Sequence, residues 1–109
     1  PKYYEFKIAG YYLYFTSYCV IECMHVQQAI ENDRSGSAKF FVKSNGDSVM
    51  QNQGVLNERE VRKIQAFIKE NYQEMYLKWA AYSKEGFYGN VKKQEEIFLV
   101  KKGLIRKND

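Results

Sequence analysis

The chain has 109 residues, a length typical of a single domain built around one hydrophobic core. Apolar residues make up 45% and charged residues 28% of the chain, a composition that excludes an intrinsically disordered protein. The net charge of +4 is only a weak indication of nucleic-acid binding. No run approaches the roughly 20 apolar residues that a membrane-spanning helix needs.

The first half of the chain is rich in aromatic residues and predicts β-strands. Residues 4–8 and 11–16 flank Ala9-Gly10, and this arrangement indicates a hairpin. Residues 19–27 form a third apolar run with several β-branched side chains. The polar stretch at residues 31–37 is predicted to be a loop.

A second hairpin is predicted around Asn45-Gly46, a pair that strongly favours a tight turn between strands. Residues 38–43 would enter this turn and residues 48–51 would leave it. Together these segments predict an antiparallel β-meander of four to five strands.

The pattern changes to a helical period after residue 54. Asn57 and Glu60 have the spacing of a capping box, which marks a helix start. Apolar residues then recur every three or four positions, at Val61, Ile64, Ile68, Tyr72, Met75, Trp79 and Tyr82. A second capping signature at Asn71 predicts a break into two helices, with one long helix as the alternative, and Gly86 would end the helical part. The chain is therefore predicted to be an α+β protein with two helices packed on one face of the sheet.

These elements place a single domain in residues 1–89. Residues 90–109 would form a basic C-terminal extension, in which residues 96–101 are predicted to be one more strand or a short helix.

The candidate reactive residues lie close together in the third apolar run. His25 is the only histidine, and Cys23 would share its strand face because side chains alternate along a strand. Even with Cys19 or Glu22 these ligands do not match a tetrahedral zinc set, and no cofactor or metal is expected. A Cys23–His25 pair acting as a nucleophile and base would need a third group and an oxyanion hole, which the sequence does not indicate.

Family resemblance comes from four ordered features: residues 11–15, residues 24–26, residues 36–42 and a helical part that ends near Trp79. Over residues 3–89 they resemble the bacterial family called domain of unknown function 4160. Its members carry a strand with the pattern His-aromatic-His-Val. Here Cys23 stands where the first His usually is, Met24 replaces the aromatic residue, and Gln27 stands where close relatives have a further His. These departures weigh against a metal or acid–base role for this strand.

The resemblance implies a small bacterial cytoplasmic protein that forms one half of a two-gene unit of toxin–antitoxin type. We therefore expect a non-enzymatic protein-interaction module that binds a small protein partner or a second copy of itself, with no membrane association. The alternatives are a protein that binds or cleaves RNA and an enzyme that uses the thiol or a metal at Cys23 and His25. The expected functional surface comprises His25, Cys23, Tyr12, Tyr14 and Lys39. For the RNA alternative, Arg34 and Lys43 would have to converge with Lys39, the two tyrosines and His25 in one basic groove.

Overall fold

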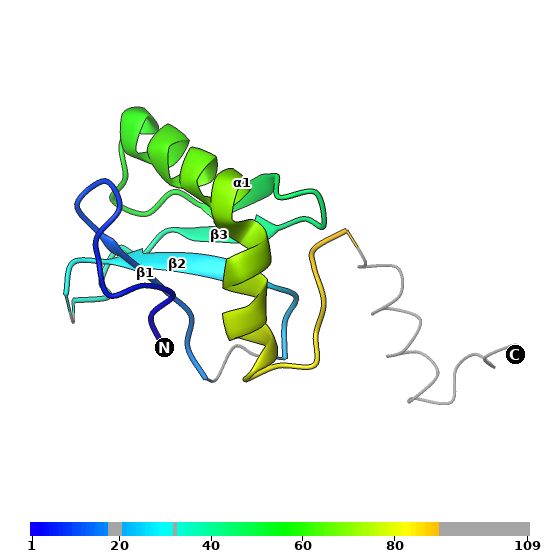
Figure 1. Cartoon of the computed structure of the whole chain (residues 1–109). Coiled ribbons are helices and arrows are strands. Elements are labelled where there is room, and N and C mark those ends of the chain that lie inside the picture. The colour runs from blue at the N-terminus through cyan, green and yellow to red at the C-terminus, as the bar shows by residue number, and fades with distance from the viewer. Residues whose placement is uncertain (18–20, 32, 90–109) are drawn as a thin grey trace, which may run out of the picture.

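The computed structural model describes residues 1–17, 21–31 and 33–89. Within them, an antiparallel sheet of order β1-β2-β3-β4 precedes a single helix, α1. Helix α1 crosses one face of the sheet (Figure 1). The bounds of the elements are β1 Tyr12–Tyr14, β2 His25–Ala29, β3 Lys39–Val42, β4 Ser48–Asn52 and α1 Glu58–Ala80. The predicted α+β class and the four-stranded meander are thus confirmed.

The hairpin between β3 and β4 forms where the Asn-Gly pair predicts it. The Lys43 N–H donates to the Asp47 carbonyl at 2.8 Å, and the Gly46 N–H donates to the Lys43 carbonyl at 2.9 Å. Gly46 has a φ of +89°, a conformation that glycine adopts at little steric cost. The turn sets a register in which Val42 faces Ser48 and Phe41 faces Val49.

The predicted fifth strand at residues 4–8 is wrong, although the turn that should follow it is present. Ile8 and Tyr11 exchange main-chain hydrogen bonds across Ala9 and Gly10. Residues 4–7 form no strand: the residues of the N-terminal segment that bond along β1 are Pro1 and Tyr3, and Tyr4 is buried like its neighbour Tyr3. A regular strand would place successive side chains on opposite faces of the sheet.

The predicted third strand is displaced towards the C-terminus. β2 begins at His25 rather than at residue 19 and runs to Ala29, while residues 18–20 lie outside the described part. The segment that follows α1 contacts the start of β2, where the Met24 N–H donates to the Gly86 carbonyl at 2.9 Å.

The predicted break at Asn71 is also wrong, because α1 is continuous. Asn71 lies inside the helix, and its side-chain amide donates to the Phe67 carbonyl one turn earlier at 2.9 Å. The amide therefore bonds a carbonyl of the preceding turn and does not cap a new N-terminus. The capping box at Asn57 is confirmed, with the Glu60 N–H donating to the Asn57 side chain at 2.8 Å. The helix ends at Ala80, before Gly86.

The core lies between α1 and one face of the sheet. Val61, Ile64, Ile68, Met75 and Trp79 of the predicted stripe are buried, whereas Tyr72 is half-buried and Tyr82 is exposed. From the sheet, the core receives Leu13, Val26, Phe40 and Val42. The alternating side chains of the same strands form what we call the second sheet face: Tyr12, Tyr14, His25, Gln27, Ala29, Lys39 and Phe41.

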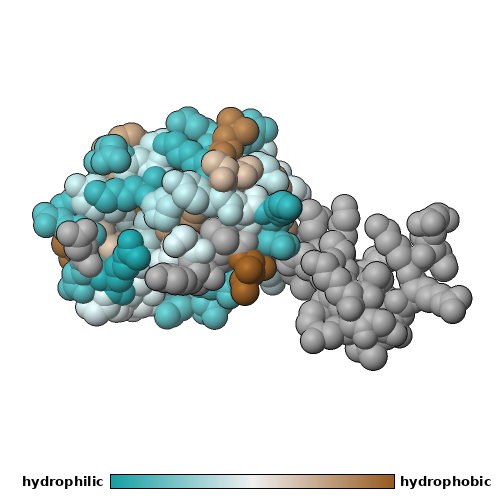
Figure 2. Space-filling view, turned by 90° about the horizontal axis from the view of Figure 1, so that it is seen from below, coloured by the Kyte–Doolittle hydropathy of each residue, from teal (hydrophilic) through white to brown (hydrophobic). Residues whose placement is uncertain are grey.

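The surface shows no extended apolar area in the view of Figure 2. Hydrophilic and weakly polar residues dominate this side, and the strongly hydrophobic residues appear as separate spots. None of the described helices is long and apolar enough to cross a membrane. The predicted elements at residues 96–101 lie outside the described residues.

Candidate functional site

The register of the strands places four of the five predicted site residues on the second sheet face: Tyr12, Tyr14, Lys39 and, at its end, His25. In the β1–β2 register Tyr12 faces Ala29 and Tyr14 faces Gln27, and in the β2–β3 register Gln27 faces Lys39. Tyr14 is buried, and its hydroxyl lies 2.9 Å from that of Ser37. The face therefore carries the predicted residues, but the ring of Tyr14 is not open to solvent.

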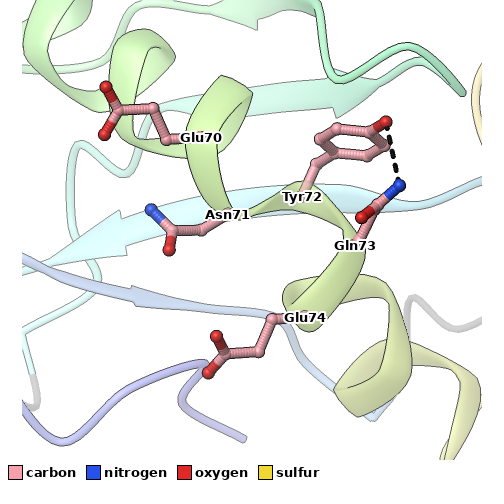
Figure 3. Close-up of a pocket in the computed structure, with 5 residues that line it drawn as sticks. All are labelled: Glu70, Asn71, Tyr72, Gln73 and Glu74. Atoms are coloured by element: carbon pink, nitrogen blue, oxygen red, sulfur yellow. Dashed lines mark hydrogen bonds between the residues drawn. The ribbon is translucent and has the colours of Figure 1, made fainter.

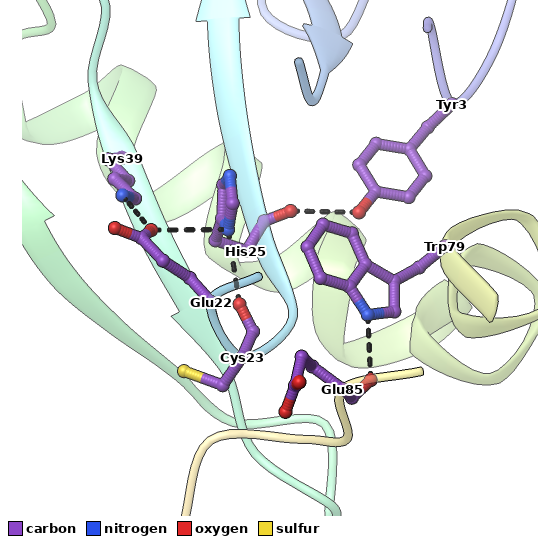
Figure 4. A network of polar contacts seen from close by, with 7 residues as sticks. All are labelled: Tyr3, Glu22, Cys23, His25, Lys39, Trp79 and Glu85. Carbon is purple, nitrogen blue, oxygen red and sulfur yellow. Dashed lines mark hydrogen bonds and ion pairs between the residues drawn. The ribbon is translucent and has the colours of Figure 1, made fainter. Parts of the chain in front are cut away.

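His25 lies at the start of β2 between rings from two elements. Its ring centroid is 5.1 Å from that of Trp79 in α1 and 6.3 Å from that of Phe41 in β3. The side chain is fully buried. On the main chain of the same residue, the carbonyl accepts a hydrogen bond of 2.8 Å from the Tyr3 hydroxyl (Figure 4).

The hydrogen bonds of the His25 ring assign its tautomer. Nδ1 lies 3.1 Å from the Cys23 carbonyl, and because a carbonyl only accepts, Nδ1 carries the proton. Nε2 is buried without a hydrogen-bond partner among the described residues. Burial lowers the pKa of His25 below its ordinary value. The ring is thus a neutral imidazole with its Nε2 lone pair in an apolar environment.

Cys23 and His25 come together, but through the main chain of Cys23. Figure 4 shows the ring directed at the carbonyl of Cys23, with the sulfur atom pointing away. Cys23 is 7% exposed, and burial is the main cause that raises the pKa of its thiol. A neutral imidazole and a protonated thiol are the opposite of the charged pair that activates a cysteine nucleophile.

An ion pair lies beside the imidazole. Glu22 accepts a hydrogen bond from the Lys39 ammonium, and its carboxylate is 3.8 Å from Nδ1 of His25. The side chain of Lys39 is 16% exposed, and that of Glu22 is 44% exposed. Lys39 is therefore paired within the chain. Within the described part, no three His, Cys, Asp or Glu side chains gather in a way that could hold a metal ion.

Cations lie over aromatic rings on and around the second sheet face. Arg34 is 4.4 Å from the centre of the Tyr14 ring, and Lys2 and Lys7 are 4.1 and 5.3 Å from the centre of the Tyr12 ring. Of the convergence required for the RNA alternative, the contact of Arg34 with Tyr14 is present. Lys43 lies instead at the β3–β4 turn, and His25 is buried, so neither joins this group. Lys2 and Lys7 were not predicted as part of this group. They precede the strands and reach Tyr12 because the N-terminal segment folds back along β1.

A second cluster, which we call the aromatic patch, was also missed. It consists of Tyr4, Phe6 and Phe67, whose ring centroids are 4.8 to 6.1 Å apart. Phe6 is 55% exposed and stacks on Tyr4, and the Lys78 ammonium lies 4.0 Å from the centre of the Tyr4 ring. Phe67 does not belong to the predicted apolar stripe of the helix. An aromatic residue outside that stripe was the sequence signal that could have indicated the patch.

The surface hollow beside residues 70–74 of α1 does not add a site. Figure 3 shows one turn of α1 in which Glu70, Asn71 and Glu74 project to one side of the helix and Tyr72 and Gln73 to the other. Side chains that diverge in this way do not converge on a ligand.

Comparison with known proteins found no relative: the sequence matches no family, no curated protein and no solved structure.

Proposed function

We propose that the chain is a non-enzymatic protein-interaction module that binds a small protein partner through the aromatic patch. The observation that carries this proposal is the exposure of Phe6, held in place by Tyr4 and Phe67. Aromatic side chains are enriched at protein interfaces, where they provide a large contact area at low entropic cost. The stacked contact to Tyr4 restricts Phe6 before any partner binds.

The chemistry around His25 supports a binding rather than a catalytic role. The imidazole is neutral and buried, and the Cys23 thiol is buried with a raised pKa. His25 contacts Trp79 of α1 and Tyr3 of the N-terminal segment, and the Cys23 carbonyl holds its ring, which are the contacts of a structural role.

The resemblance to domain of unknown function 4160 suggests where the partner is encoded. We propose a cytoplasmic bacterial protein of a two-gene, toxin–antitoxin-like unit, whose partner is the product of the neighbouring gene. The experiment is calorimetric titration of that product with the purified chain. Phe6→Ala should weaken binding by at least about tenfold, which corresponds to roughly 1.4 kcal/mol.

Leu77→Ala is the matched control, because Leu77 is 72% exposed on the same helix as Phe67 and belongs to no ring pair given above. It should bind like the unchanged chain. Equal binding by the Phe6→Ala and unchanged chains would contradict the proposal, as would failure of the two gene products to associate.

A second candidate function, RNA binding, is favoured by the cations at Tyr12 and Tyr14. Lys2, Lys7 and Arg34 would contact phosphates, and such contacts weaken as salt increases. A filter-binding assay with single-stranded RNA would test it. Lys2→Gln with Arg34→Gln should reduce binding, and an absence of binding at low salt would exclude this function.

A further inference from the structure

The two edges of the sheet differ in their hydrogen bonding. At the β1 edge, the N-terminal segment pairs with the strand: the Tyr3 N–H donates to the Leu13 carbonyl at 2.8 Å, and the Phe15 N–H donates to the Pro1 carbonyl at 3.0 Å. The β4 edge has no such partner strand within the described residues. An unpaired edge presents main-chain donors and acceptors to another chain.

The direction of the free groups on β4 follows from the ladder. Val42 donates to the Met24 carbonyl and accepts from the Tyr88 N–H, so its main-chain groups point away from β4. Ser48, which faces Val42, therefore directs its own N–H and carbonyl towards the open edge. Met50 does the same two residues later. The Ser48 carbonyl accepts a bond of 3.3 Å from Gln65 and keeps a second lone pair.

The sequence of this edge lacks the charged residues and the proline that commonly protect an edge strand against pairing. Residues 48–57 contain no charged residue and no proline, although 28% of the chain is charged. Natural edge strands commonly carry Lys or Pro at such positions. Met50 is 39% exposed at the centre of the edge, and Gln51 is the extra residue of a bulge that interrupts the regular pairing before it resumes at Asn52.

We infer that β4 is the interface through which two copies of this chain associate, by antiparallel pairing about a twofold axis at Val49. Ser48 of one copy exchanges both main-chain hydrogen bonds with Met50 of the second copy, and the Val49 side chains face each other. This pairing uses both outward-facing residues that precede the bulge. It makes one continuous sheet from the two four-stranded sheets.

Charge favours a second copy as the occupant. Under this symmetry Asp47 faces Gln51 of the second copy, so no like charges are opposed along the strand. Lys69, the cation next to this end of β4, is already bonded to the Asp47 carboxylate at 2.9 Å and to the Asn45 carbonyl at 2.9 Å. The aromatic patch is a separate surface, so this inference does not depend on the proposed function.

The test is the molar mass of the full chain by sedimentation velocity over a wide range of concentration. The mass should change from one chain to two as concentration rises, and the Ser48 and Met50 amides should become protected from hydrogen exchange in parallel. Met50→Lys should abolish the dimer because it places two like charges beside the axis. Met50→Pro should do the same, because proline lacks the outward N–H and is tolerated on an edge strand.

Ile30→Lys is the control, since Ile30 is an exposed apolar residue outside β4 and should leave the dimer unchanged. Circular dichroism confirms that each variant is folded. A single-chain mass at every concentration overturns the inference. That outcome would mean that the β4 edge stays unpaired, is covered by another part of the chain or binds a different protein. A dimer that survives both folded Met50 variants also overturns it.

Discussion

The imidazole of His25 lies against the indole of Trp79, with ring centroids 5.1 Å apart and ring planes at 68°. Both side chains are fully buried. The indole N–H of Trp79 donates to the Glu85 carbonyl at 2.9 Å, so the contact joins the start of β2, the end of α1 and the segment that follows it. Protonation of His25 would therefore place a buried charge where these three segments pack together.

Acidification should destabilise the fold through this residue. Burial holds the pKa of His25 below its ordinary value of 6.5, so the unfolded chain takes up the proton at a higher pH than the folded chain does. The contribution to the free energy of unfolding is complete above pH 6.5. It is lost as the pH falls from there through the pKa of the folded state. Urea unfolding at a series of pH values measures this dependence.

The control for the pH dependence is His25→Phe, which keeps an aromatic ring and cannot titrate. Its stability should change less between pH 6.5 and the acidic range than that of the unchanged chain. Hydrogen bonds lower the pKa of Asp33 and Asp47 from 3.8, so these groups act at lower pH and do not obscure the comparison. Parallel pH profiles for the two proteins would show that His25 is not responsible.

Substitutions of two asparagines distinguish the single helix α1 from the predicted pair of helices. Asn57→Ala should destabilise the protein by about 1 kcal/mol, because the Glu60 N–H loses its acceptor at the start of α1. Asn71→Ala should change stability by no more than about 0.5 kcal/mol, because alanine is a better helix former and no helix starts at that position. Thermal unfolding of the two variants provides the measurement. Equal losses would indicate a helix start at Asn71.

The close approach of two loops predicts a strong effect at Gly54. A Cβ atom on Gly54 would lie 2.1 Å from the Gly36 carbonyl oxygen, which also accepts a hydrogen bond from the Val55 N–H. Gly54→Ala should therefore cost more than the roughly 1–2 kcal/mol of its left-handed backbone alone. Gly10→Ala carries the same conformational cost, and a Cβ there meets no atom within 4 Å. Denaturant unfolding that ranks Gly10→Ala as equally or more damaging would contradict this contact.

Local sequence signals predicted those parts of the fold that depend on neighbouring residues. The Asn45-Gly46 turn and the Asn57 cap use hydrogen bonds between residues close in sequence, and both are present. The displaced start of β2 depends on the bond from Met24 to Gly86, about 60 residues away in the chain, which no local pattern contains.

The candidate site likewise has one part that follows from local sequence pattern and one part that depends on tertiary structure. Alternation within β1 is a local pattern that puts Tyr12 and Tyr14 on one face, whereas Lys39 joins them through the register of β2 and β3. The burial of His25 and the aromatic patch depend on how α1 and the N-terminal segment cross the sheet. Phe6 and Phe67 are distant in sequence, so only tertiary structure brings their rings together.

The reactivity of Cys23 tests the remaining enzymatic alternative directly. In a Cys19→Ser variant, Cys23 is the only thiol, and burial with a raised pKa should leave very little thiolate at neutral pH. Ellman's reagent should therefore react slowly with the folded protein and rapidly once urea has unfolded it. The Glu22→Gln variant is informative, because the Glu22 carboxylate contributes to the raised pKa and its loss should modestly accelerate the reaction. Rapid stoichiometric reaction of the folded chain at neutral pH would instead identify Cys23 as an activated nucleophile and count against a purely binding function.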